Sequence, residues 1–172
     1  VDAAAEAQPR GELSLHLQLP GLRLAPGGVL HREVRLDEVP GPAQPVLLTS
    51  GQPQSFRFSA VSRPTLMNSP GAMFQIAVPA NASRLTVRLA TTTPNVDVDL
   101  YVRFNQAPVI EGSNVAADHR SEGVTGDEQI IVTTTSSPAL RTGTYTIALA
   151  VFTPGVAVEG IVECAIGEKP GE

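Results

Sequence analysis

The sequence predicts an all-β fold, an antiparallel β-sandwich or jelly roll of about eight short strands. Three observations support this class. Apolar and polar residues alternate with a period of two in many short runs, as in strands that bury one face. The 172 residues include 15 glycines and 15 prolines but no tryptophan, and turn-forming residues bound the runs. No run has the 3.6-residue apolar spacing of a helix of ordinary length.

Eight runs are predicted strands, and together they define a domain over residues 46–168. Short strands at this spacing, with turns between them, are typical of two stacked antiparallel sheets. The runs are Ser55 to Ala60, Ala72 to Val78, Arg84 to Ala90, Val96 to Phe104, Val109 to Glu111, Gln129 to Thr134, Thr144 to Phe152 and Val156 to Ile166. The predicted core consists of Phe74, Ile76, Leu85, Val87, Val98, Leu100, Val102, Ile147 and Leu149.

Residues 1–45 form a separate N-terminal segment. Its first twelve residues are small and polar, as in a linker, whereas leucines alternate with polar residues from Leu13 to Leu19. This alternation predicts a strand, followed by a β-hairpin-like continuation to Leu36. Three prolines and a glycine in 37–45 predict a linker. We expect the segment either to add accessory strands to the sandwich edge or to be the tail of an upstream domain.

Charge and hydropathy exclude several partners. The net charge is −5 and no Lys/Arg-rich block is present, so we expect no nucleic acid or anionic lipid partner. No apolar run reaches the roughly 18 residues of a membrane span, so we expect no membrane insertion. Cys164 has no second cysteine to pair with, and we expect it to be a small buried hydrophobe.

The stretch from Asn95 to Phe104 has the clearest strand pattern. Successive side chains of a strand point to opposite faces of its sheet. Five apolar side chains therefore share one face, with Asp97, Asp99, Tyr101 and Arg103 on the other. We expect the apolar face to be core and the polar face to meet solvent.

Asp97 and Asp99 are the candidate metal ligands. Two residues apart on a strand face, their carboxylates can lie about 7 Å apart, near enough to share a cation with loop oxygens. Calcium suits such a site, because it takes six to eight oxygen ligands in irregular geometry. The alternative is structural: one carboxylate accepts main-chain N–H groups in the adjacent turn, and the other pairs with an arginine.

Tyr101, Arg103 and Tyr145 are the candidate binding residues. If exposed on one face, the tyrosines could stack on a peptide, collagen or sugar, with Arg103 beside them. The alternative for both tyrosines is packing. Tyr145 follows Gly143 by two residues and could be a corner residue whose hydroxyl bonds to backbone.

The sequence does not predict an enzyme. Its histidines are His16, His31 and His119, and His119 and Asp118 are neighbours whose side chains would point apart on a strand. Catalytic motifs for serine hydrolases, zinc peptidases and phosphate binding are absent, and zinc would need more His or Cys.

Several segments from Leu48 to about Val151 resemble the bacterial pre-peptidase C-terminal domain. Residues 97–103, Asp-Val-Asp-Leu-Tyr-Val-Arg, are closely similar to the family's Asp-x-Asp-Leu-Tyr-Val-Arg. Residues 74–80, Phe-Gln-Ile-Ala-Val-Pro-Ala, resemble its Phe-x-hydrophobic-x-Val-Pro-Ala segment. Gly126 to Ile130 and Gly143 to Ile147 follow in the family's order. The turn before the Asp pair and residues 1–45 depart from the family pattern.

The resemblance implies a non-catalytic accessory module of a secreted bacterial hydrolase. The parent catalytic domain would be a peptidase, and the module would aid binding to an insoluble protein or polysaccharide, or aid secretion and folding. Its location would be extracellular or on the cell surface. Related collagen-binding modules carry calcium, which agrees with the Asp97 and Asp99 pair. Two alternatives remain, a structural or interaction module without a substrate and a carbohydrate-binding jelly roll, the latter disfavoured by the scarcity of aromatic residues.

Overall fold

The structure is a computed structural model, and it describes residues 43–168. The chain divides into two units, Val1–Val39 and Pro40–Glu172. All the described residues belong to the second unit. The accessory strands and linker expected within residues 1–45 lie outside the described residues, apart from the last three.

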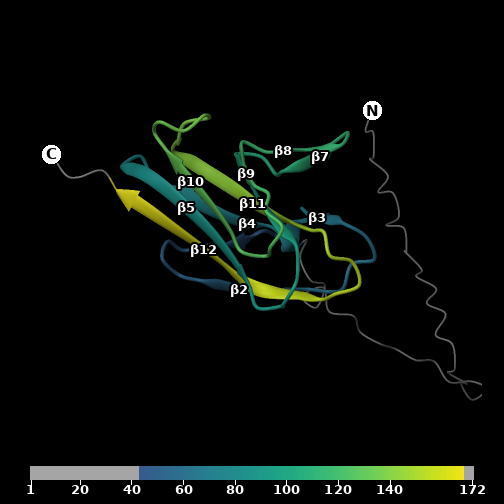
Figure 1. Cartoon of the computed structure of the whole chain (residues 1–172). Helices are drawn as coiled ribbons and strands as arrows, with labels where there is room; N and C mark the ends of the chain where they lie inside the picture. The colour runs from purple at the N-terminus through teal and green to yellow at the C-terminus, as the bar shows by residue number, and fades with distance from the viewer. Residues whose placement is uncertain (1–42, 169–172) are drawn as a thin grey trace, which may run out of the picture. The chain divides into compact units, whose positions relative to one another are not determined.

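The described part is built from two main β-sheets and a small hairpin (Figure 1). Sheet A has the order β1-β4-β11-β6-β9, and β3 also pairs with β11. Its strands are β1 (Val46–Leu47), β3 (Thr65–Met67), β4 (Phe74–Val78), β6 (Val98–Phe104), β9 (His119–Ser121) and β11 (Gly143–Val151). Its strand pairs are antiparallel except β1 with β4.

Sheet B has the order β10-β5-β12-β2, with antiparallel pairing throughout. Its strands are β2 (Gln54–Phe58), β5 (Ala82–Thr91), β10 (Glu128–Thr133) and β12 (Val158–Glu168). The hairpin pairs β7 (Val109–Glu111) with β8 (Asn114–Ala116). A 3-10 turn, η2 (Pro70–Ala72), precedes β4.

One hydrophobic core joins the facing sides of sheets A and B. In sheet A it follows the register of β6 with β11, where Leu100 lies opposite Leu149 and Val102 opposite Ile147. In sheet B, β5 and β12 contribute Val87 and Cys164, which lie opposite each other. All nine predicted core residues are buried, at 0 to 4% exposure. The predicted β-sandwich is confirmed.

A second, smaller hydrophobic cluster lies on the other face of sheet A. Residues 105–118, which include β7 and β8 and are called the cover below, supply its outer side with Ala107, Val115 and Ala117. The sheet supplies Tyr101 from β6 and two alanines from β11. Leu66 and Met73 complete the cluster. The central strands of sheet A are therefore buried on both faces.

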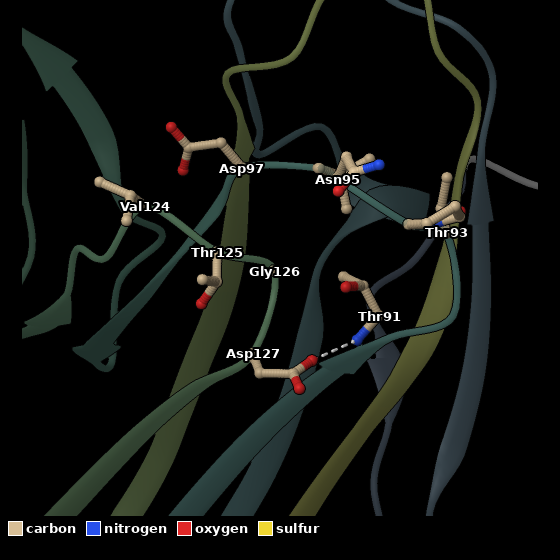
Figure 2. A pocket seen from close by; sticks show the side chains of 10 residues that line it. Thr91, Thr93, Asn95, Asp97, Val124, Thr125, Gly126 and Asp127 are labelled. Carbon is tan, nitrogen blue, oxygen red and sulfur yellow. Dashed lines mark hydrogen bonds between the residues drawn. The ribbon is translucent and has the colours of Figure 1, made fainter.

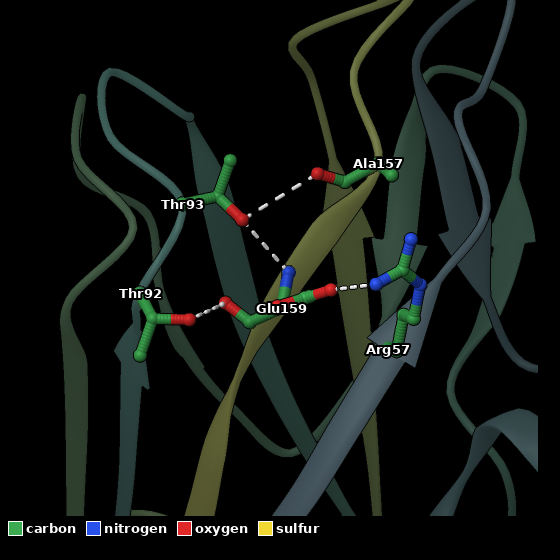
Figure 3. Close-up of polar contacts among 5 residues, drawn as sticks. All are labelled: Arg57, Thr92, Thr93, Ala157 and Glu159. Atoms are coloured by element: carbon green, nitrogen blue, oxygen red, sulfur yellow. Dashed lines mark hydrogen bonds and ion pairs between the residues drawn. The ribbon is translucent and has the colours of Figure 1, made fainter.

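One end of sheet B is tied together around Glu159 of β12 (Figure 3). The side chain of Arg57, on β2, forms an ion pair with the Glu159 carboxylate. The Thr93 hydroxyl accepts the Glu159 main-chain N–H at 2.9 Å and donates to the Ala157 carbonyl. The Thr92 hydroxyl donates to the Glu159 carbonyl at 3.2 Å. These contacts fix residues 92 and 93, where the chain leaves β5 toward β6.

Each of the eight predicted strands is present, with ends shifted by two residues or fewer. The structure adds β1, β3, β8 and β9, which have two or three residues each. Segments this short contain too few alternations to give a period.

Candidate functional site

Strand β6, which holds most of the Asp-x-Asp-Leu-Tyr-Val-Arg segment, is the centre of the candidate site. The sequence alternation predicts that its polar face meets solvent, but much of this face is buried. Asp99 is 6% exposed and Tyr101 is 2% exposed, whereas Asp97 and Arg103 are partly buried. The expectation of an exposed face was wrong for Asp99 and Tyr101. For Tyr101 the physical reason is the second cluster, in which residues of the cover pack over this face of sheet A.

Asp99, Tyr101 and Glu122 form a chain of polar contacts at the edge of this second cluster. The Tyr101 hydroxyl lies 3.1 Å from Asp99 Oδ2 and 2.8 Å from Glu122 Oε1. Glu122 follows β9, which pairs with β6 and places Arg120 opposite Tyr101. The register of two neighbouring strands therefore brings the three groups together.

Burial is the main influence on the ionisation of Asp99 and Tyr101. Loss of hydration raises the pKa of Asp99 to about 6, against an opposing effect of the Tyr101 hydrogen bond. The negative charges of Asp97, Glu122 and Glu128 raise it further. The pKa of Tyr101 is also raised, first by burial and then by its contact with Glu122, so its hydroxyl stays protonated at ordinary pH.

Glu128 organises the turn that carries Glu122. Its carboxylate accepts the Ser121 hydroxyl and, at 2.8 Å, the Gly123 main-chain N–H. Arg120 Nη1 lies 3.5 Å from Glu122 Oε1, and its Nη2 donates to the Val115 carbonyl of the cover. The connection from β9 to β10 is thus held by carboxylates at both ends.

A pocket of about 500 Å³ lies beside β6, between residues 91–97 and 124–127 (Figure 2). Its walls carry threonine hydroxyls, Asn95 and the carboxylates of Asp97 and Asp127. Asp127 Oδ1 accepts the Thr91 main-chain N–H at 3.0 Å. Figure 2 shows the Asp97 carboxylate directed away from that of Asp127.

The structure places Asp97 and Asp99, the expected calcium pair, in different surroundings. Asp99 does not line the pocket that Asp97 lines, and its Oδ2 contacts Tyr101. Among residues 43–168, no three or more His, Cys, Asp or Glu side chains converge in a way that could hold a metal ion. Asp97 Oδ1 is buried without a hydrogen-bond partner, which leaves one oxygen of this carboxylate uncompensated.

Arg103 contacts one of the residues that line a second pocket, of about 380 Å³. Its Nη1 donates to the Ala107 carbonyl at 3.3 Å, and Ala107 lines the pocket. The other lining residues are uncharged: Met73, Gln75, Asn105, Gln106, Thr144 and Thr146. The pocket therefore offers amide and hydroxyl groups to a ligand.

Tyr145 is 1% exposed and faces the main core. Its hydroxyl accepts the Arg141 main-chain N–H at 2.9 Å, and its ring packs edge-on against Phe104 at 5.2 Å. This is the geometry of the corner residue considered from the sequence, and it leaves no exposed ring for stacking on a ligand.

His119 and Asp118 lie in the described part but do not form a catalytic pair by their contacts. Asp118 Oδ2 accepts the Phe104 main-chain N–H and lies 3.7 Å from Arg141 Nη2. The pKa of His119 is lowered, mainly by burial. Nearby, the Ser121 hydroxyl donates to Glu128.

Sequence reasoning missed Glu122 as a neighbour of Asp99. Glu122 lies more than 20 residues away along the chain, and the pairing of β9 with β6 brings it near. A signal for the buried outer face was present in β11, where Ala148 and Ala150 occupy positions that would be polar on a wet face.

No helix in the described part of the chain is long and apolar enough to cross a membrane.

No family model matches the chain, and no curated protein matches it. Solved structures with similarity include a pre-peptidase C-terminal domain of a collagenase from Bacillus anthracis, with 11% identity and a TM-score of 0.40 over 74% of this chain and 97% of that one. A surface-associated copper-binding protein important in copper acquisition by Methylomicrobium album BG8 has 12% identity and a TM-score of 0.48, over 73% and 99%. A periplasmic inhibitor of g-type lysozyme from Aeromonas hydrophila has 13% identity and a TM-score of 0.38, over 73% and 97%. Likenesses at this level carry no argument about function.

Proposed function

We propose that residues 46–168 are a non-catalytic accessory module of the pre-peptidase C-terminal type. Its parent would be a secreted bacterial hydrolase, with a peptidase as the leading candidate, and its location would be extracellular or on the cell surface. The observation that carries the proposal is the place of the Asp-x-Asp-Leu-Tyr-Val-Arg segment. It forms most of β6, an interior strand of sheet A, and contributes to both hydrophobic clusters, so this signature specifies a scaffold.

The contacts of the polar groups support a role without catalysis. Acyl transfer by a side chain needs a nucleophile within hydrogen-bond reach of a base that a third group orients. In residues 43–168, Ser121 donates to Glu128 and Asp118 binds a main-chain N–H. The groups nearest to such an arrangement are therefore engaged in holding the fold.

The pocket beside Arg103 is the surface on which we place ligand binding. Uncharged amide and hydroxyl groups suit the main chain of a protein polymer, whose carbonyl and N–H groups need both donors and acceptors. Sugar rings usually stack on aromatic side chains, and no aromatic residue lines this pocket. An insoluble protein is therefore the preferred ligand over a polysaccharide.

Retention on insoluble collagen, chitin and cellulose tests the proposal with the full chain. We expect retention on collagen, and loss of most of it in the double variant Gln106→Ala with Thr144→Ala. Gln129→Ala is the matched control, because Gln129 is exposed on β10 of the other sheet. Equal retention of the double variant and the control would show that collagen binds to another surface.

The second candidate is a structural or interaction module without a substrate. The exposed side of sheet B favours it, since Ile131 and Ile161 are 46% and 36% exposed there, and exposed apolar residues on a sheet suit contact with another domain. If the wild-type chain is retained on none of the three polymers, polymer binding is rejected and this candidate is favoured.

A further inference from the structure

The side of sheet B that faces away from the main core carries two opposite charges at one level of the sheet. On β5 and β12 the main core takes Val87 and Cys164, so Arg88 and Glu163 project to the other side. The register of the two strands places Arg88 directly opposite Glu163. This side is called the outer face below, and it comprises the alternate residues of Ser55 to Arg57, Arg84 to Ala90, Gln129 to Thr133 and Glu159 to Gly167.

The two charges are not used within the chain. Opposite charges at facing positions of neighbouring strands commonly pair, but the ion pairs found among residues 43–168 include neither Arg88 nor Glu163. A hollow of about 210 Å³ lies at this point, and Thr86 and Ala165 complete its lining with the two charged residues. Both charged groups are therefore available to a partner.

The centre of the outer face is apolar and flat. Ile131 and Ile161 are 46% and 36% exposed. Their neighbours across the sheet on β5 are the small residues Thr86 and Ala90, so no long side chain there keeps a second surface at a distance. Exposed apolar side chains on a sheet favour contact with another protein surface.

A second copy of this chain matches the pattern of the outer face. We consider a rotation by 180° about an axis that runs along the strands, between β5 and β12. This rotation keeps the strand direction and lays β5 of each copy over β12 of the other. Arg88 of each copy then faces Glu163 of the other, because the two residues share one level of the sheet, and Ala90 likewise faces Ile161. Stacked sheets lie about 10 Å apart, and an arginine and a glutamate extended toward each other span that distance.

The charges also select this axis over the alternative. A two-fold axis across the strands at the same level would lay β5 over β5, and Arg88 would face Arg88 while Glu163 faced Glu163. The axis along the strands produces two attractive contacts instead, since a two-fold interface repeats each contact. The other arginine on the outer face of β5, Arg84, then faces Gly167, so it meets no like charge there.

We propose that the outer face of sheet B is a self-association surface, which joins two copies of this chain face to face through a symmetric pair of Arg88–Glu163 contacts. Four strands at the usual spacing and rise give this face about 550 Å² per copy. This is less than the roughly 800 Å² per partner of a standard interface, so the dimer is weak and forms at micromolar or higher concentration. The pocket assigned above to polymer binding lies on sheet A, where Gln75 and Thr146 line it. The dimer therefore leaves both pockets open and does not depend on that assignment.

Sedimentation equilibrium of the full chain, from about 5 μM to about 1 mM, tests the self-association. We expect a monomer–dimer equilibrium that weakens as salt is added. Arg88→Glu should raise the dissociation constant by about tenfold or more, because one substitution replaces two attractions by two repulsions. Arg63→Glu is the matched control, since it changes the net charge equally at an exposed residue outside sheet B. A wild-type chain that stays monomeric throughout, or equal effects of the two variants, would overturn the proposal.

A mixture of Arg88→Glu and Glu163→Arg tests which residues face each other. Within either variant the two facing strand positions carry like charges, so no pairing inside one chain can restore an attraction. In a mixed dimer the new carboxylate faces the new guanidinium, and the native Glu163 of one copy faces the native Arg88 of the other. We expect native mass spectrometry to show mixed dimers at close to the wild-type affinity, and neither variant to dimerise comparably alone.

A mixture that forms no more dimer than the separate variants would overturn the proposed arrangement. Circular dichroism checks that each variant is folded. If a charge reversal prevents folding, Arg88→Gln decides, because removal of the two attractions alone must raise the dissociation constant by about threefold or more. An unchanged dissociation constant in folded Arg88→Gln would likewise overturn the proposal.

Discussion

Tyr145 and Arg141 are joined by a hydrogen bond between a side chain and the backbone: the tyrosine hydroxyl accepts the arginine main-chain N–H at 2.9 Å. The arginine side chain then turns back over the ring of Phe104, 4.1 Å from its centre. Phe104 in turn packs edge-on against the Tyr145 ring. The loop before β11 is thereby fixed to the end of β6.

Tyr145→Phe tests this corner. The change removes the acceptor and leaves a partly buried N–H without its partner, so we expect a loss of about 1–2 kcal/mol in the free energy of unfolding. Urea unfolding with an unchanged m-value would measure it. Ser113→Ala, which removes one hydroxyl from an exposed residue of the hairpin turn, should change stability little. Equal effects of the two variants would contradict the corner.

Ionisation of Asp99 should lower the free energy of unfolding as the pH rises. Its pKa is raised from 3.8 to about 6 in the folded chain, so between these values the folded state holds a proton that the unfolded state has lost. The stabilisation is complete below about pH 4 and is lost through about pH 6, with a total near 2–3 kcal/mol. Urea unfolding across this range should show the step in the wild type and not in Asp99→Asn. The same pH dependence of unfolding free energy in the wild type and in Asp99→Asn would refute this role of Asp99.

Asp97→Asn distinguishes two interpretations of Asp97, a buried carboxylate without a compensating partner and a metal ligand. Because Asp97 Oδ1 is buried without a partner, we expect the amide to raise the free energy of unfolding by about 1 kcal/mol. Thermal unfolding should not respond to calcium or to a chelator. Glu111→Gln, at an exposed site on β7, is the control for charge alone. A calcium-dependent midpoint that Asp97→Asn abolishes would restore the calcium site.

The substitution Gly160→Ala tests how closely β12 approaches β5 and β2. A Cβ atom there would lie 2.5 Å from the Ala90 carbonyl oxygen and 2.9 Å from the Phe56 ring. Since a backbone atom cannot yield cheaply, Gly160→Ala should cost about 2–4 kcal/mol. Gly167→Ala on the same strand meets side-chain atoms alone, Arg84 Cβ at 3.4 Å and Ser83 Oγ at 3.9 Å, and should be far milder. The comparison of denaturation midpoints would decide.

The fold could be predicted because the inward positions of β4, β5, β6 and β11 alternate strictly and are bounded by turns. The short strands β1, β3, β8 and β9 could not, since two or three residues give no period. Their positions depend on pairing with distant strands, such as β3 with the end of β11.

The candidate site was harder to predict, because alternation gives the two faces of a strand but not what covers the polar one. Asp99 and Tyr101 have the sequence pattern of exposed residues but are 6% and 2% exposed. The segment that packs over Tyr101 begins only after Phe104. The charge environment of Asp99 also depends on Glu122 and Glu128. Glu122 follows β9, which pairs with β6, and Glu128 lies on β10 of the other sheet, so neither proximity can be deduced from the sequence. Tyr145 was the exception, because a tyrosine shortly after a turn has a local structural explanation.

Cys164 lies at 0% exposure in the main core, where burial raises the pKa of its thiol to about 12. The thiolate is the species that reacts with oxidants and disulfides. A chain that meets an oxidising exterior with one cysteine risks cross-linking to other molecules. Here the native packing itself shields the sulfur, so its reaction with a thiol reagent would report each opening of the sandwich.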